Sequence, residues 1–67
     1  SEIKMMQFIQ GLDEDTKTTF TLREIEGRTY DEIAKILDCP IGTVRSRIFR
    51  ARQLILEFMN QENIFNG

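Results

Sequence analysis

The part of this sequence best suited to chemistry is a run of eight positions that holds four arginines: Arg45, Arg47, Arg50 and Arg52. Residues 39–56 contain no acidic side chain, whereas residues 1–38 hold five basic and nine acidic ones, so the net charge of −2 conceals a local basic patch. A guanidinium can make paired hydrogen bonds to a phosphate or to guanine O6 and N7. A duplex responds to charge within a Debye length of about 8–10 Å. The patch therefore predicts nucleic-acid contact, and a merely solvated helix face is the alternative.

Other chemistry has little support in the residue types. The chain has one cysteine, Cys39, and no histidine, so it offers neither an internal disulfide nor a Cys/His zinc site, and it lacks the commonest general base. We interpret Cys39 as a small residue that fills a turn rather than as a redox sensor. The carboxylates at 13–15 are interpreted as helix-capping groups rather than a metal cluster. The sequence thus predicts a protein that is not an enzyme and uses no metal or cofactor.

Four helices must position the arginines, and no strand pattern competes with them. Their expected bounds are about residues 2–10, 13–26, 30–37 and 41–59. Gly11 and Gly27 are expected to end the first two helices, and Thr29 with Glu32 has the capping-box spacing of the third. The threonines at 16, 18, 19 and 21 are poor helix formers and make the second helix the least secure. Residues 60–67 are expected to fray. The fold class predicted is an all-α domain over residues 1–67.

The expected core faces follow from the spacing of apolar residues. In the first helix, Ile3, Met6, Phe8 and Ile9 are assigned to a broad apolar surface. The second helix is expected to use Phe20, Leu22 and Ile25. The third is expected to bury Tyr30, Ile33, Ala34, Ile36 and Leu37. The stripe of the fourth is Ile41, Val44, Ile48, Ala51 and Ile55. The remaining methionines and phenylalanines, Phe65 included, are assigned to packing of the first helix on the last, with a partner surface as the alternative.

A helix-turn-helix is predicted over about residues 29–56. A short helix, a turn at 38–40 that contains a proline, and a longer helix make this plan, and the second helix enters the major groove. Away from the core stripe, that helix presents Thr43, Arg45, Ser46, Phe49, Arg50 and Gln53. Ser46 can hydrogen-bond a base edge and Phe49 can touch a thymine methyl. Arg47 and Arg52 point further round and suit phosphates.

These residues also resemble a known family. Leu-Arg-Glu at 22–24, Tyr-Asp-Glu-Ile-Ala at 30–34 and Pro-Ile-Gly-Thr-Val-Arg-Ser-Arg at 40–47 look like region 4 of bacterial sigma factors, in particular the extracytoplasmic-function (ECF), sigma-E type. The likeness covers about residues 12–56. It implies a winged-helix-like or sigma region 4 type of fold without strands, binding to the −35 promoter element, docking on the RNA polymerase β-subunit flap, and sequestration by an anti-sigma factor.

Carried over by position, the resemblance assigns DNA roles to residues from two helices. Arg45, Ser46, Phe49 and Arg50 would face the bases, Thr43 would contact phosphate, and Arg23 would reach the DNA from the second helix. The sequence departs from the family where Leu-Asp stands at 12–13 in place of Leu-Pro, and at Lys17 in place of Arg. These departures bear on the subgroup and leave the recognition helix untouched. A whole factor also needs region 2 for the −10 element, so this chain would be a fragment or a stand-alone domain.

Two other functions stay open on the sequence. One is the DNA-binding domain of a two-component or quorum-sensing activator of the LuxR type, although Val-Arg-Ser-Arg at 44–47 favours sigma. The other is a module that acts mainly through protein contacts with an anti-sigma factor or the polymerase flap. We expect a monomer in the cytoplasm, associated with the nucleoid, since no apolar run approaches the roughly 20 residues of a membrane span and no signal peptide is evident.

Overall fold

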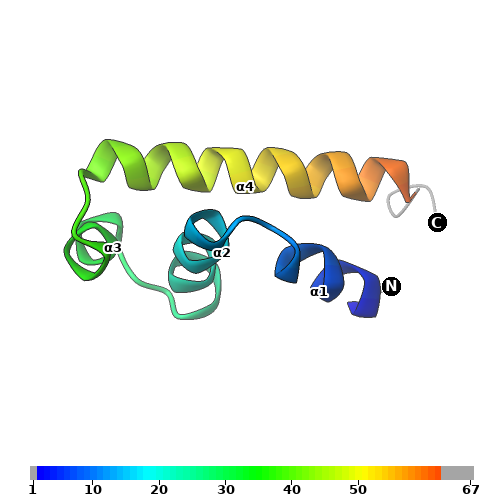
Figure 1. The fold of residues 1–67 in the computed structure, drawn as a ribbon, viewed down its shortest axis with the longest axis horizontal. Helices are drawn as coiled ribbons and strands as arrows, with labels where there is room; N and C mark the ends of the chain where they lie inside the picture. Colours follow the sequence, from blue (N-terminus) through cyan, green and yellow to red (C-terminus); the bar gives the residue numbers. More distant parts are fainter. Residues whose placement is uncertain (1, 63–67) are drawn as a thin grey trace.

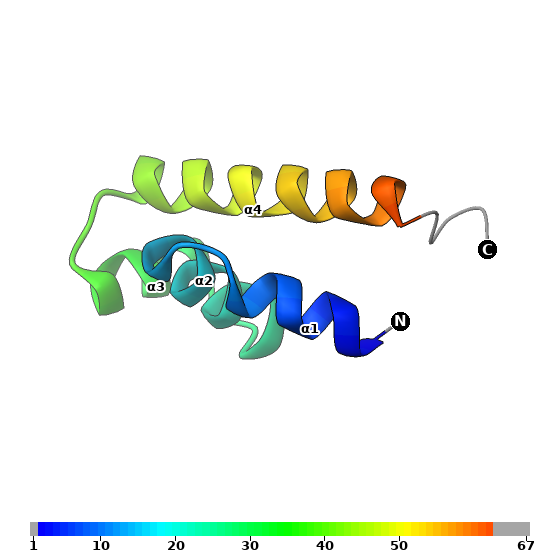
Figure 2. The ribbon, with the colours of Figure 1, turned by 45° about the vertical axis from the view of Figure 1, so that its right-hand side comes forward.

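The computed structural model describes residues 2–62, and these residues form helices and short connections with no strand (Figure 1). The elements are α1 (Glu2–Gln10), α2 (Glu14–Phe20), the π-helix η1 (Thr21–Ile25), α3 (Tyr30–Leu37) and α4 (Ile41–Gln61). The long helix α4 runs along one side of the molecule, and α1, α2 and α3 all lie on the same side of α4 (Figures 1 and 2). The prediction of an all-α fold with a helix-turn-helix is confirmed.

The core lies where α3 and α4 meet the first turn of η1. Ile33, Val44 and Ile48 are buried together. Partly buried side chains surround this cluster: Leu22, Tyr30, Ala34, Leu37 and Cys39. Ala51 extends the buried stripe along α4, while Ile41 and Ile55 are half-buried. The prediction for α3 was wrong at Ile36, which is 52% exposed because it sits on the side of α3 turned away from α4.

Helix α2 packs against α4, and its buried side chains are threonines. Thr16 and Thr19 are both buried. The Thr16 hydroxyl donates to Asp13 Oδ2 at 2.9 Å, and the Thr19 hydroxyl donates to the Asp15 carbonyl at 2.8 Å. Because each hydroxyl is satisfied locally, two residues with low helix propensity can lie at a close helix–helix contact.

The second expected helix changes character at Thr21. The Glu26 amide donates to the Thr21 carbonyl at 3.1 Å, five residues back, so residues 21–25 form a π-helix. The wider turn shifts the residues that follow relative to an α-helical register. Leu22 keeps its place against the core, but Ile25 is 73% exposed. The prediction that Ile25 makes a core contact was therefore wrong.

Two left-handed residues end the helices that flank the core. Gly27 has φ 71°, as expected for a helix-ending glycine, and the Arg28 amide donates to the Leu22 carbonyl at 3.0 Å. Asp38, the first residue of the predicted turn at 38–40, has φ 52° and ends α3. Aspartate tolerates this conformation better than most residues. Pro40 then precedes α4, so three residues turn the chain between the two helices of the motif.

Helix α1 packs against the far end of α4. Phe8 and Phe58 stack with ring centroids 4.5 Å apart, and Lys4 Nζ lies 3.0 Å from Glu62 Oε1. The expected broad apolar surface of α1 is only partly used, since Ile3 and Met6 are 69% and 65% exposed. One neighbouring helix can cover only one side of α1, which explains the difference.

The end of α4 lies two residues beyond its expected limit of 59, at Gln61. Fraying was expected for residues 60–67, but residues 63–67, Phe65 among them, lie outside the described part of the chain. Within the described part, no helix combines the length and apolar character needed to cross a membrane.

Two carboxylates at the starts of α2 and α3 have lowered pKa values, so we expect the fold to lose stability in acid. Hydrogen bonds from the Thr16 hydroxyl and amide hold the pKa of Asp13 below its ordinary 3.8, and the hydrogen bond from the Thr29 amide lowers the pKa of Glu32 below 4.5. The folded protein thus binds these protons less readily than the unfolded chain. The resulting stability is complete above the ordinary pKa values and is lost as pH falls through the lowered ones.

We expect the thermal midpoint to fall from about pH 5 downward, and to fall less steeply in the double variant Asp13→Asn/Glu32→Gln. Circular dichroism melts across this pH range measure the effect. Glu57→Gln serves as the control because this acid lies on α4, outside both caps. A double variant whose midpoint has the same pH dependence as the control would contradict the assignment.

Candidate nucleic-acid interface

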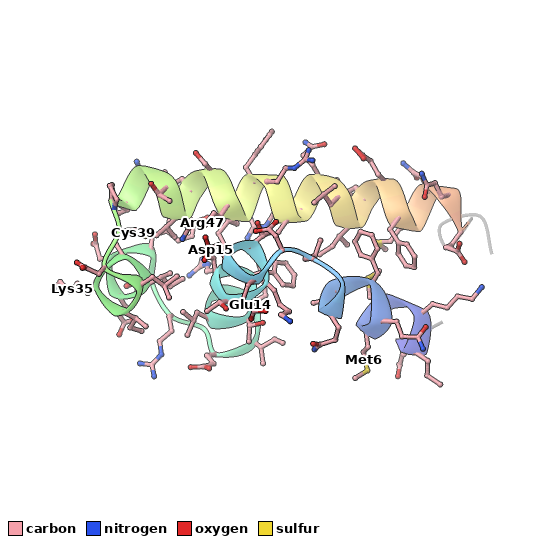
Figure 3. All side chains as sticks on the ribbon, in the orientation of Figure 1. Met6, Glu14, Asp15, Lys35, Cys39 and Arg47 are labelled. Atoms are coloured by element: carbon pink, nitrogen blue, oxygen red, sulfur yellow. The ribbon has the colours of Figure 1, made fainter. Side chains whose placement is uncertain are left out.

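Helix α4 has a buried side and a solvent side, and the two sides differ in chemistry. Val44, Ile48 and Ala51 are buried against the other helices. The solvent side carries exposed residues on successive turns: Gly42, Arg45, Ser46, Phe49, Arg50 and Gln53. In Figure 3, side chains project from α4 on the side that faces away from α2 and α3. The predicted face is therefore free to enter a groove.

Two arginines lie on this face, Arg45 and Arg50. The guanidinium group of neither one makes an ion pair or a side-chain hydrogen bond to a residue in the range 2–62. Both are exposed, and Phe49 beside them is 66% exposed. An apolar ring exposed to water between two unpaired arginines is unfavourable for the free protein, and it adds nothing to the packing of the core. This combination of cations and an apolar ring matches the edges of base pairs, which present acceptors and thymine methyl groups.

The start of α4 adds a second polar feature. Pro40 precedes the helix and gives no side-chain cap, and the first turn contains no acid. No side chain therefore caps the amides at the start of α4, where the positive end of the helix dipole favours an anion. Thr43, half-buried in this turn, donates its amide to the Pro40 carbonyl at 3.0 Å. The phosphate contact expected of its hydroxyl stays a prediction.

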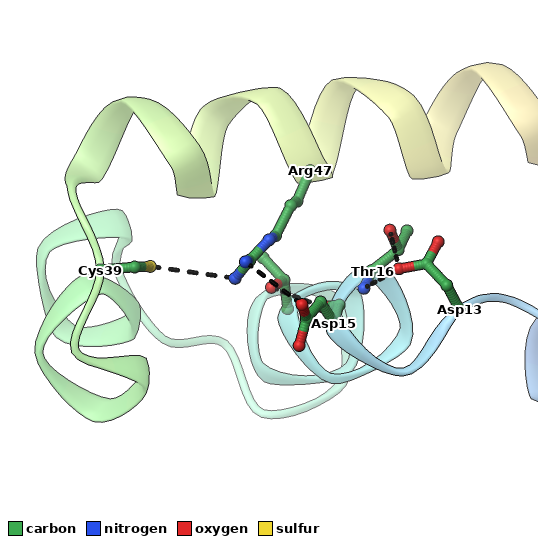
Figure 4. A network of polar contacts seen from close by, with 6 residues as sticks. Asp13, Asp15, Thr16, Cys39 and Arg47 are labelled. Atoms are coloured by element: carbon green, nitrogen blue, oxygen red, sulfur yellow. Dashed lines mark hydrogen bonds and ion pairs between the residues drawn. The ribbon is translucent and has the colours of Figure 1, made fainter.

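Arg47 lies on a flank of α4 and points toward the rest of the domain (Figure 4). Its Nη2 lies 3.5 Å from Asp15 Oδ2 on α2, and its Nη1 lies 3.9 Å from the Cys39 sulfur. The side chain is only 26% exposed. Cys39 itself is half-buried and packs against the core, which agrees with its interpretation as a small residue filling the turn.

Arg52 is likewise engaged within the domain. Its Nε and Nη2 donate to the same oxygen of Glu24, Oε1, at 3.2 and 2.5 Å. This hydrogen bond is the main cause that raises the pKa of Arg52. Neighbouring Arg23 donates to the Arg28 carbonyl at 2.9 Å and lies over the Tyr30 ring, 5.1 Å from its centroid. The π-helix thus presents Arg23 and Glu24 toward the junction with α3 and α4.

The structure divides the predicted DNA contacts into two groups. Arg45, Ser46, Phe49 and Arg50 lie together on the solvent side of α4. The other arginines, Arg23, Arg47 and Arg52, make contacts inside the domain. Sequence reasoning missed Asp15 and Glu24 as partners of α4, because they are 32 and 28 residues away along the chain and only the fold brings them close.

Among residues 2–62, no group of three His, Cys, Asp or Glu side chains is placed so that it could hold a metal ion. Of the carboxylates at 13–15, Asp13 caps α2 by accepting from the Thr16 amide, as predicted.

Comparison with known proteins gives consistent results. The family model described as "Sigma-70, region 4" matches residues 2–55. The chain is 60% identical over 57 residues to the ECF RNA polymerase sigma-E factor of Haemophilus influenzae, covering 82% of this chain and 30% of that protein. It is 57% identical over 54 residues to the RNA polymerase sigma-H factor of Pseudomonas aeruginosa, covering 81% and 28%. It is 55% identical over 56 residues to the ECF RNA polymerase sigma-E factor of Escherichia coli, covering 81% and 29%. The chain thus spans about three tenths of the length of these relatives.

Proposed function

The chain belongs to the region 4 family of sigma-70 factors, and we propose on that basis that it binds the −35 element of promoter DNA and directs transcription initiation as part of a sigma factor. The observation that carries the proposal is the division of α4 into a buried stripe and an opposite face with two unpaired arginines, Arg45 and Arg50. A helix anchored along one side and cationic along the other is suited to the major groove.

The residues have separate roles in this proposal. Arg45, Ser46, Phe49 and Arg50 contact base edges and provide the sequence preference. Thr43, Arg47 and Arg52 contact phosphates on either side of the groove, and Arg23 reaches the backbone from η1. Phosphate contacts fix the position of α4 without distinguishing sequences. The proposed function is DNA binding, and it requires no catalysis, metal or cofactor.

The other candidate functions are ranked by specific observations. The region 4 match does not favour a LuxR-type activator. A protein contact is supported by α1, whose outer side leaves Ile3 and Met6 exposed beside Gln7 and Gln10. We propose RNA polymerase, through its β-subunit flap, as the second partner of the domain, with an anti-sigma factor as a competing one. The domain acts as a monomer in the cytoplasm, at the nucleoid.

Fluorescence anisotropy of the native chain on two duplexes tests the DNA proposal. One duplex carries the −35 element of a sigma-E-dependent promoter and the other has the same composition in scrambled order. We expect at least about fivefold tighter binding to the element, because one bidentate arginine contact contributes about 1–3 kcal/mol of discrimination. Binding to both should weaken steeply as salt rises. Equal affinity for the two duplexes would contradict the proposal and favour the protein-contact function.

A further inference from the structure

Two of the four arginines on α4 already have carboxylate partners. Arg52 pairs with Glu24 on η1, and Arg47 pairs with Asp15 on α2. Arg47 and Arg52 are five positions apart, which places them on opposite flanks of an α-helix. The two carboxylates therefore border the DNA-facing side of α4 on both sides.

The Glu24–Arg52 pair is the stronger of the two. Two N–H groups of Arg52 converge on Glu24 Oε1, and the Glu24 side chain is only 35% exposed. The Arg47–Asp15 pair has a longer distance, 3.5 Å, and its carboxylate is 75% exposed. The Glu24–Arg52 pair is stronger because it is shorter and has two donors on a charged acceptor, although the Arg52 side chain is 51% exposed and that of Arg47 is 26% exposed.

A carboxylate and a DNA phosphate offer the same kind of oxygen to a guanidinium. Arg52 must therefore leave Glu24 or share its donors before it can serve a phosphate, and Glu24 stays close to that phosphate as a like charge. We propose that Glu24 competes with the DNA backbone for Arg52 and so limits the affinity and the salt dependence of sequence-independent DNA binding. The inference rests on the proposed function, since it assumes that α4 lies against DNA.

The proposal predicts that removing the Glu24 charge strengthens binding, which loss of a merely structural contact would not do. In Glu24→Gln, Arg52 is free for a phosphate. On the scrambled duplex at low salt, we expect about two- to fivefold tighter binding, the range that exposed ion pairs support. The slope of log K against log salt should become steeper by about 0.9, the value for one added phosphate contact. Asp15→Asn should act in the same direction with a smaller effect.

Glu26→Gln is the matched control. It changes the net charge from −2 to −1, as Glu24→Gln does, but Glu26 pairs with Arg28, which is not on α4. If the control tightens binding as much as Glu24→Gln, general charge explains the effect and the proposal fails. The proposal also fails if Glu24→Gln weakens binding or binds neither duplex at low salt, because Glu24 would then support the DNA-binding geometry instead of opposing contact.

Two further variants make the result independent of folding. In an Arg52→Gln background, Glu24→Gln should tighten binding no more than the control Glu26→Gln does, and an effect there as large as in the native background would overturn the proposal. Glu24→Asp withdraws the carboxylate by one methylene, and it must move binding in the same direction as Glu24→Gln. Circular dichroism of each variant reports its helix content. The preference of the native chain for the element over the scrambled duplex tests the proposed function separately, because these comparisons use the scrambled duplex alone.

Discussion

Replacing Ile48 by alanine is expected to leave most molecules unfolded at 37 °C. Ile48 is 1% exposed and belongs to the buried cluster with Ile33 and Val44. Truncating a buried isoleucine costs about 2–5 kcal/mol, from lost burial and from the cavity left behind. A single core in a chain of fewer than about 70–80 residues rarely supplies more than about 3–5 kcal/mol. One substitution therefore removes most of the free energy of unfolding.

Urea denaturation followed by circular dichroism measures this effect. Ile36→Ala is the control, since it removes the same atoms from a side chain that is 52% exposed, and surface substitutions change stability by about 0.5 kcal/mol or less. If both variants had the same urea midpoint, the core assignment would be wrong. The DNA affinity of Ile48→Ala should fall as well, because the helix that carries the core stripe also carries the residues that we propose to face the DNA.

The sequence predicted helices where the signals are local. The bounds of α1 and α3 agree with the structure. The capping box at Thr29 and Glu32 is present with both hydrogen bonds, at 3.1 and 2.8 Å. A cap is specified by residues three positions apart, so it can be recognised without knowledge of the rest of the fold.

Errors arose where neighbouring helices decide which residues are buried. Apolar spacing placed Ile25, Ile36, Ile3 and Met6 inward, yet all four are largely exposed. A π-helix displaced the first, and the remaining three face away from the helix that covers their element. Conversely, Thr19 is fully buried because its small side chain satisfies its own hydroxyl and lets α2 approach α4.

The candidate interface could be predicted in outline because it is the complement of the α4 core stripe. Val44, Ile48 and Ala51 identify the buried side, and the opposite side follows from helical geometry. The state of each arginine could not be predicted in this way. Whether a guanidinium is unpaired, as in Arg50, or paired, as in Arg52, depends on carboxylates that the fold supplies from distant segments.

Arg50→Ala is expected to remove sequence preference more than affinity. Arg50 is exposed, has no partner within residues 2–62, and lies one turn from Ser46 and beside Phe49. If its guanidinium contacts a guanine edge, its loss should cost about 1–3 kcal/mol on the −35 element and much less on the scrambled duplex. Arg47→Ala is the control, because a phosphate contact is lost equally on both duplexes.

The ratio of affinities for the element and the scrambled duplex, measured for the native chain, Arg50→Ala and Arg47→Ala, separates base contacts from phosphate contacts. We expect Arg50→Ala to lower this ratio by an amount equivalent to about 1–3 kcal/mol. We expect Arg47→Ala to leave the ratio unchanged while it weakens both complexes and reduces the salt slope by up to about 1. An Arg50→Ala variant that keeps the native ratio would contradict the claim that the solvent side of α4 contacts the bases.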